Sequence, residues 1–250
     1  MGNDRSAAKR PTRTPAEEAL RARADEFHKG GMPFQMAMAV AHGRMTLSDA
    51  LERMSRKDRV TRLVEDQGLS RALATQVAMG HVELKTILRR RRLKEHRELN
   101  RDRTMLEVGN RLTFGLHGKR VLSGTVKATA PYSITVELDS GEEEEIHKLQ
   151  IKFVYVPTDW KRAKKAIKTD KALSKAPRDP VPRPQDRYGC SDKRVFTFID
   201  RGDEIAITTL EGEVIRGKPV WFSRYEIAVE VRGDATIYVF RHALHNVSTI

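Results

Sequence analysis

The stretch LEGEVIRGKPVWFSRYEIAVEVRGDATIYVFRHALHNV, residues 210–247, alternates short β-rich runs with glycine turns. Runs of Val, Ile, Tyr and Trp bounded by turn residues are typical of β-strands. Gly217 stands within one of these runs, where a residue without a Cβ allows a strand to bend sharply. The last run ends on Phe240-Arg241-His242, so the strand end carries a cation and a histidine. The pattern predicts a small, strongly bent antiparallel sheet.

A second copy of this pattern occupies residues 111–156. The residues that align at an offset of 93 are Gly124 with Gly217 and Tyr132 with Tyr225. One residue of slippage places His147-Lys148 on Arg241-His242. Because each copy contains five short runs, we expect two five-stranded antiparallel domains, over residues 104–156 and 194–250.

Residues 16–103 have apolar side chains at helical spacing, which predicts a helical domain. Within it, MAMAVAHGRMTLSDALERM (36–54) matches LATQVAMGHVELKTILRRR (73–91) at an offset of 37, and each unit predicts a helix, a glycine C-cap and a second helix. Residues 1–15 are polar and predict a disordered tail, and residues 157–193 predict a basic, proline-rich linker. The whole chain is therefore expected to belong to the α+β class.

The stretch QGLSRALATQVAMGH (67–81) also resembles the recognition element of a helix-turn-helix protein. In that interpretation Ser70, Arg71 and Thr75 face DNA, and the chain is a transcriptional regulator whose β-domains serve assembly. In the other interpretation Ser70 is an ordinary N-cap and the apolar positions form a core.

The C-terminal stretch resembles the Sm-like fold, and within it the bacterial RNA chaperone family Hfq. Gly212 and Gly217 stand at the family's loop and bend positions, and Phe222 and Tyr225 at its two aromatic positions. Phe240-Arg241-His242-Ala243 matches the family's Tyr-Lys-His-Ala signature, after a turn about two residues longer. The resemblance covers residues 203–250 well and residues 110–156 more loosely.

In Hfq-like proteins the matching positions line a uridine pocket between neighbouring subunits. The resemblance therefore implies that Tyr225, Arg241 and His242 bind single-stranded RNA, through stacking, phosphate contacts and hydrogen bonds. The corresponding residues of the first copy are Tyr132, His147 and Lys148.

The two copies are not expected to bind equally. The first copy carries four acids in its hairpin, residues 142–145, and these would repel phosphate. It also has a candidate helix over Leu93–Val108, whereas no clear amphipathic helix is predicted before the second copy. Exposed sheet edges suggest a homo-oligomeric ring formed through edge strands.

The net charge of +13, from 47 basic and 34 acidic residues, indicates a polyanionic partner. Single-stranded RNA is the main expectation and DNA the alternative. The cations expected to add weaker phosphate contacts are Arg89, Arg90, Arg91, Arg92, Lys161, Arg162, Lys164 and Lys165.

Other function classes find little support in the sequence. It contains no glycine-rich phosphate loop and no nucleophile elbow, so we expect no enzyme and no cofactor. Its single cysteine, Cys190, makes a thiolate metal site or an internal disulfide improbable and suits a reducing compartment. No stretch of about 18 apolar residues occurs, so no membrane partner is expected. The expected role is cytoplasmic post-transcriptional regulation or RNA chaperoning.

Overall fold

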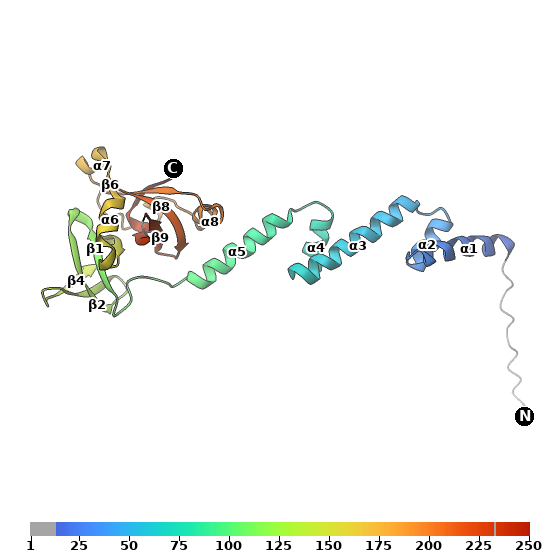
Figure 1. Cartoon of the computed structure of the whole chain (residues 1–250), viewed down its shortest axis with the longest axis horizontal. Coiled ribbons are helices and arrows are strands. Elements are labelled where there is room, and N and C mark those ends of the chain that lie inside the picture. Colours follow the sequence, from blue (N-terminus) through green and yellow to red (C-terminus); the bar gives the residue numbers. More distant parts are fainter. Residues whose placement is uncertain (1–13, 233) are drawn as a thin grey trace, which may run out of the picture. The chain divides into compact units, whose positions relative to one another are not determined.

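The computed structural model describes residues 14–232 and 234–250 (Figure 1). Contacts divide the chain into two compact units, with the boundary after Arg89. Over the described residues the chain contains eight α-helices and an antiparallel sheet of eleven strands, so it belongs to the predicted α+β class. The predicted tail, residues 1–15, lies outside the described residues except for Thr14 and Pro15. Thr14 caps the first helix through a capping box with Glu17.

Helices make up the first unit. They are α1 (Pro15–Lys29), α2 (Phe34–Ala41), α3 (Leu47–Gln67) and α4 (Arg71–Ala78), and α5 (Leu84–Asn100) crosses the boundary. The short helices α2 and α4 each end at a turn with a left-handed glycine, Gly43 or Gly80. In both turns this glycine donates a backbone hydrogen bond to the carbonyl three residues earlier, at 3.0 Å. The 37-residue repeat of the sequence is therefore a repeat of backbone geometry.

Two β modules make up most of the second unit. The first β module (residues 111–155) contains β1 (Arg111–Leu116), β2 (Val121–Thr129), β3 (Ser133–Leu138), β4 (Glu143–His147) and β5 (Ile151–Tyr155). The second β module (residues 192–249) contains β7 (Ile205–Thr209), β8 (Glu213–Phe222), β9 (Glu226–Val231), β10 (Ala235–Phe240) and β11 (Leu244–Thr249). In each module the strands lie in the order fifth, first, second, third, fourth. A 3-10 turn precedes the fifth strand in each, at Lys148–Gln150 and Arg241–Ala243.

Both modules bend at a glycine in their second strand, which is β2 in the first module and β8 in the second. A Cβ at Gly217 would lie 2.1 Å from the carbonyl oxygen of Glu230, and one at Gly124 would lie 2.3 Å from that of Glu137. No side chain fits at these distances, because the neighbouring backbone occupies the space. The two glycines thus let the strands approach closely enough to curve the sheet.

The register corrects one detail of the predicted alignment. His147 lies opposite Ser133, and Phe240 lies opposite Glu226, so the offset of the glycines and tyrosines continues to the strand end. Lys148 is therefore the counterpart of Arg241, and the predicted slip of one residue is wrong. The slip came from matching His147-Lys148 with Arg241-His242, two pairs in which the histidine and the cation stand in opposite order.

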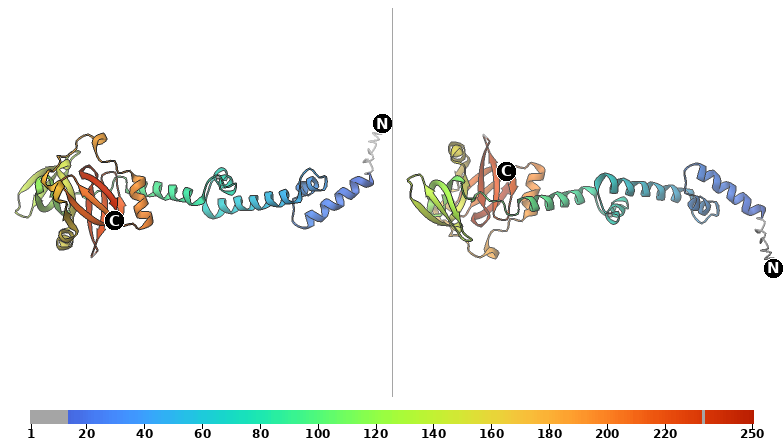
Figure 2. Two further views of the ribbon diagram at one scale, coloured as in Figure 1. Left: turned by 90° about the horizontal axis from the view of Figure 1, so that it is seen from above. Right: turned by 90° about the horizontal axis from the view of Figure 1, so that it is seen from below.

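The two modules are joined by strand pairing within the chain. β10 pairs with β5 through Tyr238 opposite Val154, which makes one continuous path from β11 to β4. Figure 2 shows the green strands of the first module beside the orange and red strands of the second. Their cores interlock at this joint, because Phe153 and Tyr155 of β5 belong to the core of the second module. In return, Phe240 of β10 belongs to the core of the first.

The predicted linker, residues 157–193, contains regular structure. Its elements are η3 (Pro157–Asp159), α6 (Trp160–Ala166), β6 (Ile167–Thr169), α7 (Lys171–Lys175) and η4 (Pro184–Asp186). β6 pairs with β8 through Ile167 opposite Ile215. The Ala163 side chain of α6 is fully buried in the core of the second module. The segment packs against that module, so its lysine-rich helix α6 does not have to be stable in isolation.

A helix precedes the second copy, contrary to the sequence-based expectation. α8 (Asp192–Arg201) begins at the N-cap Ser191 and ends at the left-handed Gly202. It buries Val195, Phe196 and Phe198. The caps were present in the sequence, but a helix of ten residues gives few apolar repeats. The helix expected over Leu93–Val108 ends at Asn100, and its Leu93 packs against the core of the second module.

Candidate nucleic-acid interface

The exposed ring of Tyr225 lies beside the end of β10. Tyr225 stands in the turn between β8 and β9, and 49% of its surface is exposed. The backbone N–H of Arg241 donates to the carbonyl oxygen of Tyr225 at 2.8 Å. This bond fixes the 3-10 turn after β10 next to the tyrosine. The structure thus brings together two of the three residues predicted for the site.

The guanidinium of Arg241 is held in a half-buried niche. It donates to the carbonyl of Cys190 at 3.0 Å, lies 2.9 Å from a carboxylate oxygen of Asp192, and sits over the Phe222 ring at 5.3 Å. Its side chain is 18% exposed. Within the described residues its Nε makes no hydrogen bond. Its Nη2 lies near Asp192, but the angle of this contact does not suit a hydrogen bond. These contacts hold the cation in place, and its Nε and Nη2 atoms are buried.

A pocket of about 480 Å³ borders this cluster, between the C-terminal half of α5 and the β8–β9 turn. Its basic lining residues are Lys94, Arg97, Arg101 and Arg224, and it also includes Phe222 and Asp192. The His96 ring packs on Phe222 at a centroid distance of 4.4 Å, and burial lowers the pKa of His96. An uncharged imidazole therefore packs on Phe222 beside the pocket.

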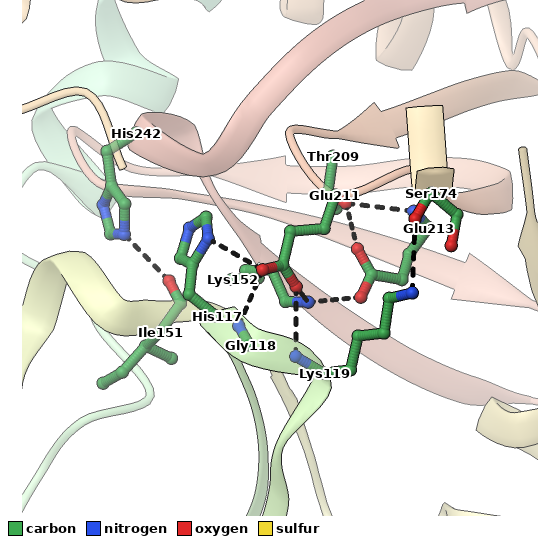
Figure 3. Close-up of polar contacts among 10 residues, drawn as sticks. All are labelled: His117, Gly118, Lys119, Ile151, Lys152, Ser174, Thr209, Glu211, Glu213 and His242. Carbon is green, nitrogen blue, oxygen red and sulfur yellow. Dashed lines mark hydrogen bonds and ion pairs between the residues drawn. The ribbon is translucent and has the colours of Figure 1, made fainter. Parts of the chain in front are cut away.

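A buried ionic network connects the two modules (Figure 3). Lys152 of β5 is 1% exposed and donates to both Glu211 and Glu213. Glu211 also accepts from the backbone N–H of Gly118, at 2.6 Å. Burial alone would raise the pKa of Glu211, but hydrogen bonds from Lys152 and Gly118 outweigh it and lower this pKa. The network is a fixed ionic contact between the modules, away from solvent.

His242 faces the first module (Figure 3). One of its ring nitrogens lies 2.8 Å from the carbonyl oxygen of Ile151, and burial lowers the pKa of His242 to about 4. The neighbouring His117 side chain is also buried, and its Nδ1 lies 3.5 Å from a carboxylate oxygen of Glu211. The structure therefore places His242 in the joint between the modules and uncharged at neutral pH.

The first module repeats the backbone arrangement with different side chains. The N–H of Lys148 donates to the carbonyl of Tyr132 at 2.8 Å, and Tyr132 is 76% exposed. The Lys148 ammonium donates to the carbonyl of Ala130 at 2.5 Å, and burial lowers its pKa. A ring nitrogen of the exposed His147 accepts from the N–H of Leu149. An aromatic ring and a cation thus recur at corresponding places.

The other predicted phosphate contacts are spread over two elements. On α5, Arg91 pairs with Glu95 at 3.1 Å and Arg92 with Asp200 at 2.7 Å, whereas Arg89 belongs to the first unit. On α6, Lys164 lies over the Trp160 ring at 4.7 Å and Arg162 lies 3.5 Å from Asp159. The remaining three, Arg90, Lys161 and Lys165, are exposed.

The residues of the helix-turn-helix interpretation lie on α4. Ser70 is the N-cap of this helix and accepts from the N–H of Leu73 at 3.4 Å. The Thr75 hydroxyl donates to the Arg71 carbonyl at 2.8 Å. Arg71 is exposed, and the apolar face of α4 is buried.

Comparison with known proteins gives no family. No protein-family model matches this chain, and no curated protein matches it significantly. No helix among the described residues is long and apolar enough to cross a membrane. The same residues contain no cluster of three or more His, Cys, Asp or Glu side chains suited to a metal ion.

Proposed function

We propose that this chain is an Sm-like RNA-binding protein, related in mode of action to Hfq, that binds single-stranded RNA in post-transcriptional regulation or RNA chaperoning. The observation that carries the proposal is the repeated pairing of an exposed tyrosine with a cation, at Tyr225–Arg241 and Tyr132–Lys148. The strand order and the 3-10 turn shared by both modules support the Sm-like part of the proposal.

The chemistry of the second module suits a single strand. An exposed aromatic face stacks on any base, and stacking contributes about 1–3 kcal/mol per base. The pocket beside Tyr225 supplies cations for the phosphates, including Arg97 and Arg224. Arg241 places a positive charge at the pocket's border, through its contacts with the lining residues Asp192 and Phe222. His242 contributes through the joint that positions this turn.

Exchanging the aromatic ring tests this proposal. Tyr225→Ala should weaken binding of oligouridine by roughly 5–150-fold, the equivalent of one lost stacking contact. Phe34→Ala is the control, because Phe34 is an exposed aromatic residue (37%) of the first unit and belongs to neither candidate binding surface. Fluorescence anisotropy of a labelled strand measures both. Equal affinities of the wild type and Tyr225→Ala for oligouridine would contradict the proposed binding site. Preferential binding of duplex DNA would favour the interpretation as a transcriptional regulator.

The proposed partners include further copies of the chain. The β10–β5 joint pairs Tyr238 with Val154, and the counterparts of these residues at the two ends of the sheet are Glu145 and Val247. Pairing β4 of one chain with β11 of the next would repeat the same joint and close a ring, for example of three chains. The Val247 carbonyl now accepts from Arg194 at 2.6 Å, and ring closure requires its release.

A proline tests the ring without disturbing the module. The bonds Leu138 N–H to Glu142 and Lys148 N–H to Tyr132 set the alternation along β4, so the N–H of Glu145 points away from β3. Glu145→Pro removes that outward donor and should yield monomers. Glu145→Ala removes the same charge and should leave the assembly intact. Light scattering at micromolar concentration distinguishes the two, and a monomeric wild type would reject the ring.

A further inference from the structure

A second cavity lies in the second β module, where β8 changes partners. β6 pairs with the first part of β8, as Ile167 opposite Ile215 shows. β9 pairs with the part after the bend, from Lys218 opposite Glu230 onward. Arg216 and Gly217 lie between these two pairings. The bend and the change of partner leave a groove of about 900 Å³, which we call the β8 groove.

Nine of the thirteen residues that line this groove are charged. Its cations come from α6, β6, β8 and the end of β9, and they are Arg162, Lys165, Lys168, Arg216, Lys218 and Arg232. Its acids are Glu204, Glu230 and Asp234. Six cations against three carboxylates leave a surplus of positive charge on one concave surface.

These cations are poorly neutralised by the protein. Among the described residues only Arg162 has an ion pair within 4 Å, with Asp159 at 3.5 Å. Glu230 lies opposite Lys218 in the register and offsets part of its charge. Like charges gathered in a groove repel one another, so a bound anion would stabilise the arrangement.

The walls of the groove are held by the core. α6 buries Ala163 completely, which fixes the helix against the second module. Arg162 and Lys165 are three residues apart on the face that lines the groove, whereas Lys164 lies over Trp160. The linker segment therefore brings its cations to β8 in a set geometry, and binding does not require the segment to fold first.

The lining selects the class of ligand. Pockets for small organic molecules have similar volumes, about 300–1,000 Å³, but are lined mainly by hydrophobic and aromatic side chains. A groove with six cations suits repeated phosphates better. We infer that the β8 groove binds the phosphodiester backbone of single-stranded RNA, as a second contact separate from the pocket beside Tyr225. The inference rests on the proposed RNA-binding function and adds the path of the strand.

A strand without bases separates the groove from the base site. The full-length chain is titrated with a labelled abasic phosphodiester strand and with oligouridine, each about 20 nucleotides long, enough for more than one site. The groove variant is Lys165→Gln, Arg216→Gln and Lys218→Gln. The matched control, Lys171→Gln, Lys175→Gln and Lys193→Gln, removes the same charge from exposed lysines outside the groove.

The groove variant should lose affinity for the abasic strand by at least about tenfold at low salt. The slope of log Kd against log salt should become shallower by about 2, from about 0.7 for each of three lost phosphate contacts. The control should keep most of its affinity. Equal losses in both variants overturn the groove, even where Tyr225→Ala still weakens oligouridine binding. A wild type that binds neither strand at low salt overturns the groove and the proposed function together.

Discussion

The two β modules share a backbone plan and differ in what covers them. Both bend at a glycine and place a tyrosine beside a cation, at Tyr132–Lys148 and Tyr225–Arg241. The second module is packed by α8, α6 and the C-terminal half of α5, whereas these helices contribute no residue to the first module's core. Among the described residues the covered module has two cavities lined by charged side chains, and Tyr132 of the uncovered module is more exposed (76%) than Tyr225 (49%). The added helices, more than the strands, distinguish the two candidate surfaces.

The largest expected effect concerns the ionic network between the modules. Lys152→Met removes the cation that two glutamates share and leaves Glu211 buried without its charge partner. We expect the free energy of unfolding to fall by about 3–5 kcal/mol. Urea unfolding measures it. Combining Lys152→Met with Glu211→Gln and Glu213→Gln should recover much of the loss, and no recovery would show that the lysine acts through packing.

The second prediction concerns pH, at a position where the modules differ. His242 corresponds to Leu149, and its folded pKa of about 4 lies below the ordinary 6.5. The unfolded chain therefore binds a proton that the folded chain resists, and stability is lost as pH falls from 6.5 to 4. Between pH 7 and pH 4, wild type should lose up to about 3 kcal/mol more than His242→Leu. Taking the difference cancels other groups, such as Glu226, whose pKa burial raises to about 7. Urea unfolding of both proteins at pH 7 and pH 4 measures this difference in the loss of stability.

Substituting the bend glycines tests whether the modules share one backbone plan. Gly217→Ala and Gly124→Ala each place a methyl group against a neighbouring carbonyl, at 2.1 and 2.3 Å. Each should cost about 1–3 kcal/mol of unfolding free energy. Thermal unfolding of the two variants gives the comparison. A large effect in only one module would mean that its counterpart can relax.

The smallest expected effect is on RNA. Tyr132→Ala should weaken oligouridine binding by less than Tyr225→Ala, and by no more than about fivefold. The β3–β4 hairpin, which starts next to Tyr132, carries four acids toward its turn, including Glu144, which is paired with Arg120. Anisotropy titrations at one salt concentration compare the two. A larger loss for Tyr132→Ala would reverse the assignment of the main binding module.

Local pattern was enough to predict most of the elements. The bend glycines, the tyrosine positions and the helical repeat follow from spacing alone. The joint does not, because the pairing of Tyr238 with Val154 depends on packing between distant segments. The placement of His242 was missed for the same reason, since no local pattern tells a buried histidine from an exposed one.

The environment of Arg241 could also not be predicted from the sequence. Asp192 and Cys190 reach it only because α8 forms. The caps Ser191 and Gly202 were a usable signal for that helix. The partners of Lys152 were not predictable, because Glu211 and Glu213 follow it by more than fifty residues along the chain.

The interlocked joint has a consequence for synthesis of the chain. β5 emerges from the ribosome roughly 80 residues before β10, which pairs with it. At about 5–20 residues per second, the strand IKFVY would wait roughly 4–16 s with an unpaired, apolar edge. During this interval the first module also lacks Phe240, which completes its core. The nascent chain is thus most exposed to aggregation just before its C-terminal strands appear, and slowing translation there should lower the yield of folded protein.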